Sequence, residues 1–161
     1  METSETPPMV TLTQPEAVAL LSTGQVGRLV YTRRALPAVT PVNYALRDGA
    51  IWIWTASASS MAQAVRGAVV AFEVDELDMA ARSGWSVTVL GVAELVVDAA
   101  EIERALELGP EPWVPGRKEH LIRIPLKMVS GRRIQDSVSD GSALLGARGV
   151  GDHGSLAQEA S

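Results

Sequence analysis

The chain has 161 residues, a formal net charge of −5, 47% hydrophobic residues and no cysteine. This length predicts one domain with a buried core, and the negative charge argues against a nucleic-acid surface, which would carry clustered Lys and Arg. The absence of cysteine excludes disulfides, thiolate metal sites and cysteine nucleophiles. No apolar run reaches the roughly 18 residues of a membrane span, and the first residues do not fit a signal peptide, so we expect a cytoplasmic protein.

The N-terminal part of the chain predicts an arm, a helix and two strands. Residues 1–11 are Pro-rich and acidic and predict a flexible arm. Residues 13–22 begin with the capping box Thr-Gln-Pro-Glu and predict a short helix. Strands are expected at 27–31 and 37–46. Because prolines cannot donate to a β-ladder, the two prolines of the second strand predict that part of it lies at a sheet edge or a bulge.

A hydroxyl-rich loop follows the next hairpin. Asp48-Gly49 predicts a tight turn into a buried strand at 50–54, Ala-Ile-Trp-Ile-Trp, and a second capping box opens a helix at 60–66. Because unpaired N–H groups at a helix start attract anions, the loop between them predicts a phosphate site. An ordinary Ser-rich loop before a capped helix is the alternative. The hydroxyl side chains of this candidate site are Thr55, Ser57, Ser59 and Ser60.

The rest of the chain predicts three more strands, at 68–74, 85–97 and 121–129. About ten residues of loop should separate the first two, and a helix capped by Asp98 should follow the second. Gly91 interrupts the inward face of the strand at 85–97, which predicts a bulge or a close approach by another segment. Residues 136–161 lack an apolar period and predict a disordered tail.

These elements define a fold class. Six strands joined mostly by short turns, with about three short helices, favour a mainly β protein. Its predicted architecture is an antiparallel barrel with peripheral helices, formed by one domain over residues 12–135.

Several kinds of chemistry are not expected. The two histidines, His120 and His153, have no ligand partner at helical spacing, so no metal site is predicted. The chain has no Gly-x-Ser-x-Gly elbow and no phosphate-binding loop of the Walker type. The acidic residues within 73–78 fit a solvated strand end better than a cation site. The catalytic residues therefore stay unassigned.

Seven short motifs carry a resemblance to a known family. They are Gly27-Arg-Leu, Pro41-Val-Asn-Tyr, the loop and helix at 55–66, Phe72-Glu-Val-Asp-Glu, Ser83-Gly-Trp-Ser-Val with Gly91, Pro112-Trp-Val-Pro-Gly and Gly131-Arg-Arg-Ile. Their order and spacing, over about residues 12–134, resemble the pyridoxamine 5′-phosphate oxidase-like family of FMN-binding split barrels. The resemblance implies a six-stranded antiparallel split barrel that forms homodimers with two flavins at the subunit interface.

The resemblance also implies roles for individual residues in binding FMN. Backbone groups would run beneath the isoalloxazine ring at Pro41, Val42 and Asn43. The hydroxyl-rich loop would bind the FMN phosphate, and Arg28 would add positive charge beside it.

Other residues would complete the site. Trp85 and Ser86 would line the flavin pocket, from the second subunit of the dimer. Trp113 and Arg117 would shape the substrate side. The implied activity is that of a flavin-dependent oxidoreductase acting on a small molecule.

One position departs from the family pattern. Many relatives have a lysine where this chain has Ser60, and a glycine where it has Ala58. Losing that cation removes a charge-assisted contact to the phosphate worth about 1–3 kcal/mol. The resemblance implies FMN as the cofactor, or a deazaflavin in its place as in some relatives, and the alternative function is a non-catalytic flavin- or deazaflavin-binding carrier. A dimer without any cofactor is a third possibility.

Overall fold

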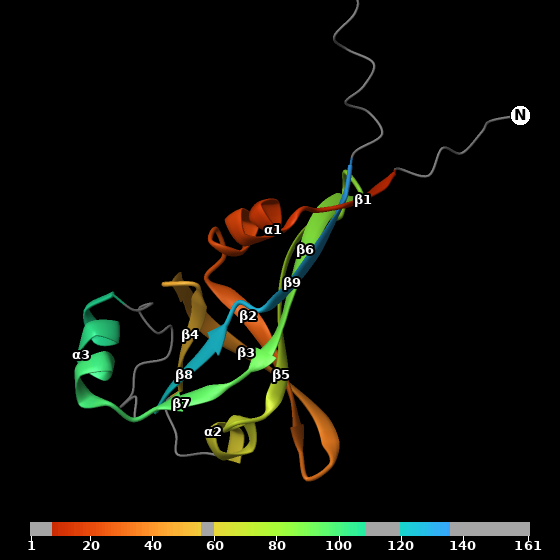
Figure 1. Ribbon diagram of the computed structural model, residues 1–161. Helices are drawn as coiled ribbons and strands as arrows, with labels where there is room; N and C mark the ends of the chain where they lie inside the picture. Colours follow the sequence, from red (N-terminus) through yellow and green to blue (C-terminus); the bar gives the residue numbers. More distant parts are fainter. Residues whose placement is uncertain (1–7, 56–59, 109–119, 136–161) are drawn as a thin grey trace, which may run out of the picture.

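The computed structural model describes residues 8–55, 60–108 and 120–135 (Figure 1). The described residues form three helices, α1 (Gln14–Leu21), α2 (Ser60–Val65) and α3 (Ala99–Leu108). Their nine strands are β1 (Met9–Thr11), β2 (Val26–Arg33), β3 (Leu36–Arg47), β4 (Ala50–Thr55), β5 (Val69–Asp78), β6 (Ser83–Val92), β7 (Glu94–Val96), β8 (His120–Pro125) and β9 (Met128–Ile134). No helix within these ranges is long and apolar enough to cross a membrane.

All the strand pairs are antiparallel, in the order β1-β9-β6-β5-β2-β3-β4-β8-β7. The long strand β3 joins two layers: residues 36–43 pair with β2, and residues 44–47 pair with β4. We call β1, β9, β6, β5, β2 and β3 the long sheet, and β3, β4, β8 and β7 the short sheet. Their inner faces meet around the core, and the helices lie on the short-sheet side of the long sheet (Figure 1). The predicted fold class, a mainly β antiparallel barrel with peripheral helices, is confirmed.

The core is built from the inward side chains of both sheets. Alternate positions of a strand point to opposite faces, and the inward positions of the central strands are mainly apolar. The fully buried members include Leu29, Ile51, Ile53, Phe72, Val87, Val89, Ile122 and Ile124. A second, smaller cluster lies outside the barrel, where Ile102 and Ala105 of α3 pack against Trp54, Val96 and Leu121.

Gly27 allows close packing at the centre of the core because it has no side chain. A Cβ at this position would collide with the ring of Phe72, which is fully buried. The Phe72 ring also meets Tyr44 edge to face, with centroids 4.9 Å apart. The Tyr44 hydroxyl donates to the carbonyl of Leu21 and so ties α1 to the barrel, and burial raises the pKa of Tyr44 to about 12.

The number of strands differs from the six predicted. The strand expected at 85–97 is two strands, because the chain passes from the long sheet to the short sheet at the buried Ala93, whose N–H donates to the carbonyl of Ala68. The strand expected at 121–129 ends at Pro125, and a new strand begins at Met128. The residues just before the first predicted helix form β1 against β9.

The loop expected after residue 74 is also shorter than predicted. β5 continues to Asp78 and pairs with β6 along its whole length, from Val69↔Val92 to Asp78↔Ser83. The connection needs only four residues, since the Asp78 carboxylate accepts bonds from the backbone N–H groups of Ala80 and Ala81. Charged residues at this end of β5 are exposed to solvent, so they do not destabilise the pairing of β5 with β6.

Three local predictions are confirmed. Thr13 and Glu16 form the reciprocal capping box of α1. A Cβ at Gly91 would lie 2.9 Å from the carbonyl oxygen of Pro125, which is the predicted close approach. Among the strands that the structure describes, β2 is the one that pairs with residues 36–43 of β3, so Pro37 and Pro41 lie in a segment at the edge of the long sheet.

The β2–β3 turn yields a stability prediction. Its two central residues, Arg34 and Ala35, have φ of 51° and 62°, a left-handed conformation that costs L-residues about 1–2 kcal/mol each. Ala35→Gly removes part of this strain, and we expect it to raise the free energy of unfolding by about 1 kcal/mol. Urea denaturation would measure the change. The matched substitution Ala38→Gly, within the strand, should destabilise the protein; a destabilised Ala35→Gly would contradict the strain.

Candidate functional site

The outer face of the long sheet carries a row of mainly polar residues. Directly paired residues on neighbouring antiparallel strands point to the same side of a sheet. The pairs Pro41↔Arg28, Arg28↔Glu73, Glu73↔Thr88 and Thr88↔Ser130 therefore set five outward side chains in one line across five strands. We call these five residues the polar row.

An ion-pair cluster lies at the centre of the polar row. The Arg28 guanidinium is 2.8 Å from the Glu73 carboxylate and 3.3 Å from that of Asp75. Burial, and then the neighbouring Asp75, raise the pKa of Glu73 above its ordinary value, while Arg28 opposes the rise. With one cation and two carboxylates, the cluster has a net negative charge when all three groups are ionised.

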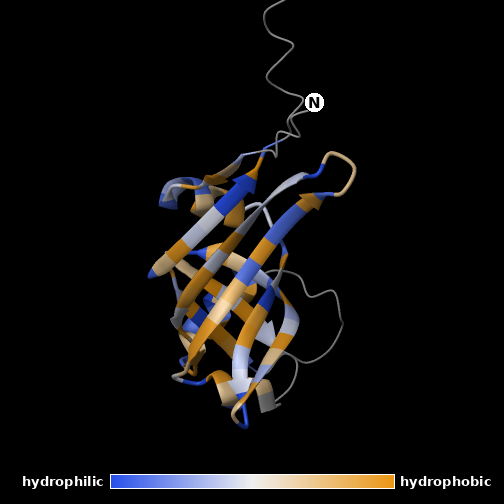
Figure 2. Ribbon diagram, turned by 90° about the vertical axis from the view of Figure 1, so that its right-hand side faces the viewer, coloured by the Kyte–Doolittle hydropathy of each residue, from blue (hydrophilic) through white to orange (hydrophobic). Residues whose placement is uncertain are grey.

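A row of apolar residues runs beside the polar row. The pairs Val39↔Val30, Val30↔Ala71, Ala71↔Leu90 and Leu90↔Met128 place these five side chains in line on the same outer face. Val39 is 60% exposed, Leu90 41% and Met128 64%. We call these five residues the apolar row. Figure 2 looks onto this side of the protein, where strands and no helix of the described residues face the viewer.

Four predicted site residues share the outer face. Arg28 and Pro41 pair directly across β2 and β3, and Asn43 lies two residues further along the same side of β3. Ser86 stands opposite Asp75, next to the ion-pair cluster. The predicted contacts of these residues with a flavin stay predictions.

Three other predicted residues lie on the inner side of the barrel. Val42 and Thr55 are 9% and 8% exposed, and Trp85 packs against the core. Trp85 and Ser86 therefore present opposite faces of β6, as neighbours on a strand must. Ser57, Ser59, Trp113 and Arg117, and the side chain of Ser60, lie outside the described residues.

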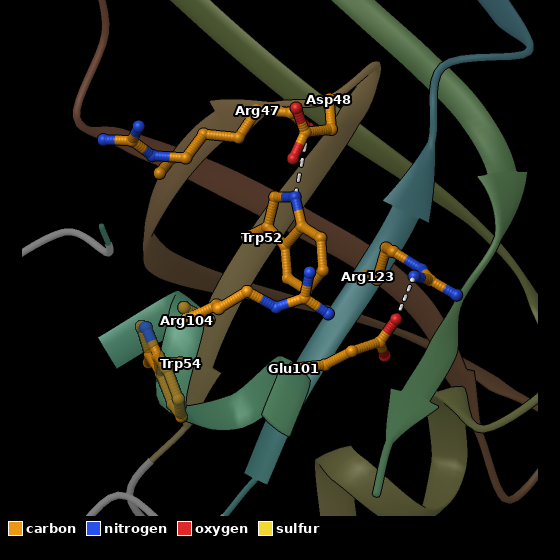
Figure 3. A pocket seen from close by; sticks show the side chains of 9 residues that line it. Arg47, Asp48, Trp52, Trp54, Glu101, Arg104 and Arg123 are labelled. Carbon is orange, nitrogen blue, oxygen red and sulfur yellow. Dashed lines mark hydrogen bonds and ion pairs between the residues drawn. The ribbon is translucent and has the colours of Figure 1, made fainter. Parts of the chain in front are cut away.

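A pocket of about 220 Å³ lies where the predictions placed no site, between α3 and the outer side of the short sheet (Figure 3). Its floor is formed by Ala45 and Trp52, which pair directly on β3 and β4, and by Trp54. The wall is α3, and the rim is the β3–β4 turn. The remaining lining residues are Arg47, Asp48, Glu101, Arg104, Ala105 and Arg123.

The arginines of the pocket differ in their partners. Arg123 is 2.7 Å from Glu94 and 3.4 Å from Glu101, and its guanidinium lies 5.5 Å from the centre of the Trp52 ring. Arg47 and Arg104 have no carboxylate partner among the described residues. Trp52 is held in place because its indole N–H donates to the Arg47 carbonyl at 3.1 Å.

A signal for this pocket was present in the sequence. Trp52 and Trp54 alternate with Ile51 and Ile53, so the two pairs point to opposite faces of β4, and the isoleucines are the pair that faces the barrel core. Two large apolar side chains on an outer face require a cover, and α3 supplies it. Within the described ranges, no group of His, Asp and Glu side chains is arranged to hold a metal ion.

The fold and this arrangement of side chains define an antiparallel barrel whose outer face carries a polar row beside an apolar row. The family model for pyridoxamine 5′-phosphate oxidase matches residues 13–133, and the chain belongs to that family. The predicted membership is thus confirmed.

Individual relatives support the same assignment. An uncharacterised Mycobacterium tuberculosis protein, Rv0080, is 40% identical over 131 residues, which cover 78% of this chain and 86% of that protein. The structure of a conserved protein of unknown function from Corynebacterium diphtheriae is 33% identical with a TM-score of 0.68, over 80% of this chain and 99% of that one. A Mycobacterium smegmatis FAD-binding protein is 26% identical with a TM-score of 0.62, over 80% of this chain and 100% of that one.

The ion-pair cluster yields a titration prediction. Arg28→Gln removes the group that lowers the pKa of Glu73, so that pKa, already above the ordinary 4.5, should rise further. Carbon-detected NMR titration of the Glu73 carboxyl would measure it in both proteins. The raised pKa means that the Glu73 contribution to stability is present below the unfolded-state pKa and is lost as the pH rises through the folded-state pKa.

Arg33→Gln is the control for this titration, since Arg33 lies at the exposed end of the same strand. It should leave the Glu73 titration unchanged. An unchanged or lowered pKa of Glu73 in Arg28→Gln would show that the ion pair is not formed in solution.

Proposed function

We propose that this protein is a flavoprotein that binds FMN against the outer side of β3. The observation that carries the proposal is the strip of Pro41 and Asn43, which share the outer side of one strand at a sheet edge. A proline and short side chains at an edge leave space for a flat ring, and backbone groups on the edge are accessible to its polar atoms. Membership of the family and the FAD-binding relative support a flavin ligand.

The FMN phosphate would be bound by the loop that precedes α2. Thr55 ends β4 and α2 begins at Ser60, so the loop spans the hydroxyl-rich residues and the N–H groups at the helix start. Arg28 is a weaker candidate for this role than the sequence suggests, because Glu73 and Asp75 already occupy its guanidinium. Neutral hydroxyls and backbone N–H groups would then carry most of the binding.

We further propose that the protein is an oxidoreductase acting on a small organic molecule. A bound flavin accepts and donates hydride, and the protein around it supplies position and electrostatics. The titratable groups beside the proposed ring site, Arg28, Glu73 and Asp75, are held in ion pairs. They would therefore act by fixing the charge next to the ring and not by exchanging protons with substrate.

A carrier that binds a flavin or a deazaflavin without turnover is the second candidate. The observation that favours it is the net negative charge of the ion-pair cluster, together with Ser60 in place of the lysine found in many relatives. Both weaken the hold on a phosphate, which suits a ligand that must leave. Steady turnover of a reduced nicotinamide with an electron acceptor would favour the oxidoreductase.

The phosphate site is tested by Ser59→Ala combined with Ser60→Ala. Each lost hydroxyl removes a hydrogen bond to a charged group, worth about 1.5–3 kcal/mol, so the FMN dissociation constant should rise at least tenfold. Fluorescence titration with FMN would measure it, and the mass of the ligand released by heating would distinguish FMN, FAD and a deazaflavin. Ser22→Ala, at the end of α1, is the control. Unchanged FMN affinity in the double variant would exclude this loop.

We propose in addition that the protein is a homodimer joined through the apolar row, with a flavin at the edge of the interface. Exposed apolar side chains in a contiguous row are typical of a surface that meets a partner. Val30 and Val39 of the apolar row lie two residues from Arg28 and Pro41 on the same two strands. A second copy packed on the apolar row would therefore also border the proposed ring site. The two predicted properties, dimerisation and flavin binding, are in this way coupled.

Leu90→Lys tests the dimer, because it sets a charge in the middle of the apolar row. We expect the mass measured by light scattering to fall from two chains to one, with weaker FMN binding as a consequence. Val97→Lys is the matched control: Val97 is 77% exposed and lies outside the row. A dimer that persists in Leu90→Lys would place the interface elsewhere.

A further inference from the structure

The pocket under α3 has the walls of a site for a flat ring. Trp52 and Trp54 line it with aromatic surface, and Ala45 leaves space above the first of them. The indole of Trp52 is anchored at its N–H and Trp54 is packed in the cluster under α3. Both surfaces are thus fixed before any ligand arrives, which lowers the entropic cost of binding.

The pocket also contains an arginine, Arg104, that has no carboxylate partner among the described residues. The Arg104 side chain extends from α3 toward Trp52 (Figure 3), and its Nε atom donates to the carbonyl of Ala100 in the same helix at 3.4 Å. Among the described residues its terminal amino groups have no carboxylate to bind. Arg47, at the rim of the pocket, likewise has no carboxylate partner among the described residues.

The charges of the lining select a single negative charge. Arg123 is engaged by Glu94 and Glu101, so the positive charge open to a ligand is that of Arg47 and Arg104, and the lining carboxylate that opposes it is Asp48. A dianion would meet the Asp48 carboxylate with too few cations, whereas a planar carboxylate matches the two-pronged donor of an arginine.

The size of the pocket limits the ligand to one ring. Pockets for drug-sized ligands occupy about 300–1,000 Å³, and this one has about 220 Å³. The three fused rings of a flavin do not fit inside it. The pocket is thus distinct from the proposed flavin site, although Ala45 continues the same side of β3 beyond Asn43.

We propose that the α3 pocket binds a single-ring aromatic carboxylate, with the ring against Trp52 and Trp54 and the carboxylate on Arg104. We infer that this ligand is the substrate of the flavoprotein. That assignment rests on the proposed flavoprotein function, because β3 would connect the bound ligand to the flavin ring. Its binding does not depend on the flavin.

The test is a titration of the full-length protein with benzoate, followed through the indole N–H signals of the tryptophans in ¹H–¹⁵N spectra. We expect the signals of Trp52 and Trp54 to shift and that of Trp85, which lies on the inner side of β6 and outside the pocket, to stay in place. Benzamide has the same shape without the charge and should bind at least tenfold more weakly. Phenyl phosphate should also bind more weakly than benzoate. Equal affinity for benzoate and benzamide would overturn the proposal.

Arg104→Gln is the decisive variant, since Arg104 is exposed and its replacement leaves the apolar contacts of α3 intact. The dissociation constant for benzoate should rise about tenfold, and the preference for benzoate over benzamide should disappear. Arg33→Gln should change neither. Unaltered benzoate binding in Arg104→Gln would overturn the proposal.

The same titration with and without saturating FMN separates the two proposals. Benzoate binding in a protein that takes up no FMN would support the pocket and count against the flavoprotein. FMN binding in a protein that does not bind benzoate would support the flavoprotein and overturn the proposal for the pocket.

Discussion

The contact between Gly27 and the Phe72 ring is the constraint on which the site depends. It lets Phe72, the largest fully buried side chain among the described residues, lie directly across β2, and it fixes the pairing of β2 with its two neighbours. A slip of one residue would exchange the two faces of β2, turning Arg28 inward and Leu29 outward. The polar and apolar rows, and with them the proposed flavin site and dimer surface, exist only in the register that this contact selects.

Local signals predicted much of the fold because they act within a few residues. The Thr13 capping box and the Asp48-Gly49 turn are of this kind. The turn at Arg34-Ala35 carries no glycine, and the tertiary structure imposes it against the preference of both residues. The extension of β5 to Asp78 was missed because charged residues suggest a loop, whereas an exposed strand end tolerates them.

The candidate site was less predictable than the fold, since it is formed by pairs distant in sequence. Arg28 was expected to offer its charge to a phosphate, but Glu73 and Asp75, more than 40 residues away, already bind it. No spacing rule places those groups together; the sheet register does. The pocket under α3 is likewise lined by residues of β3, β4, β8 and a helix that are distant in sequence. The alternation of Trp and Ile on β4 indicated only that one apolar pair lies on the outer face and needs a covering element.

The edge of β3 over residues 37–41, which no other described strand covers, has a consequence for how this protein can associate. Prolines at positions 37 and 41 deprive that edge of two donors, so a second strand cannot extend the sheet there by continuous backbone pairing. Association through this edge is left to side chains, which single substitutions can change one at a time. Assembly at this edge can therefore be gained, lost or redirected by single substitutions, whereas an assembly formed by backbone pairing would be much less sensitive to them.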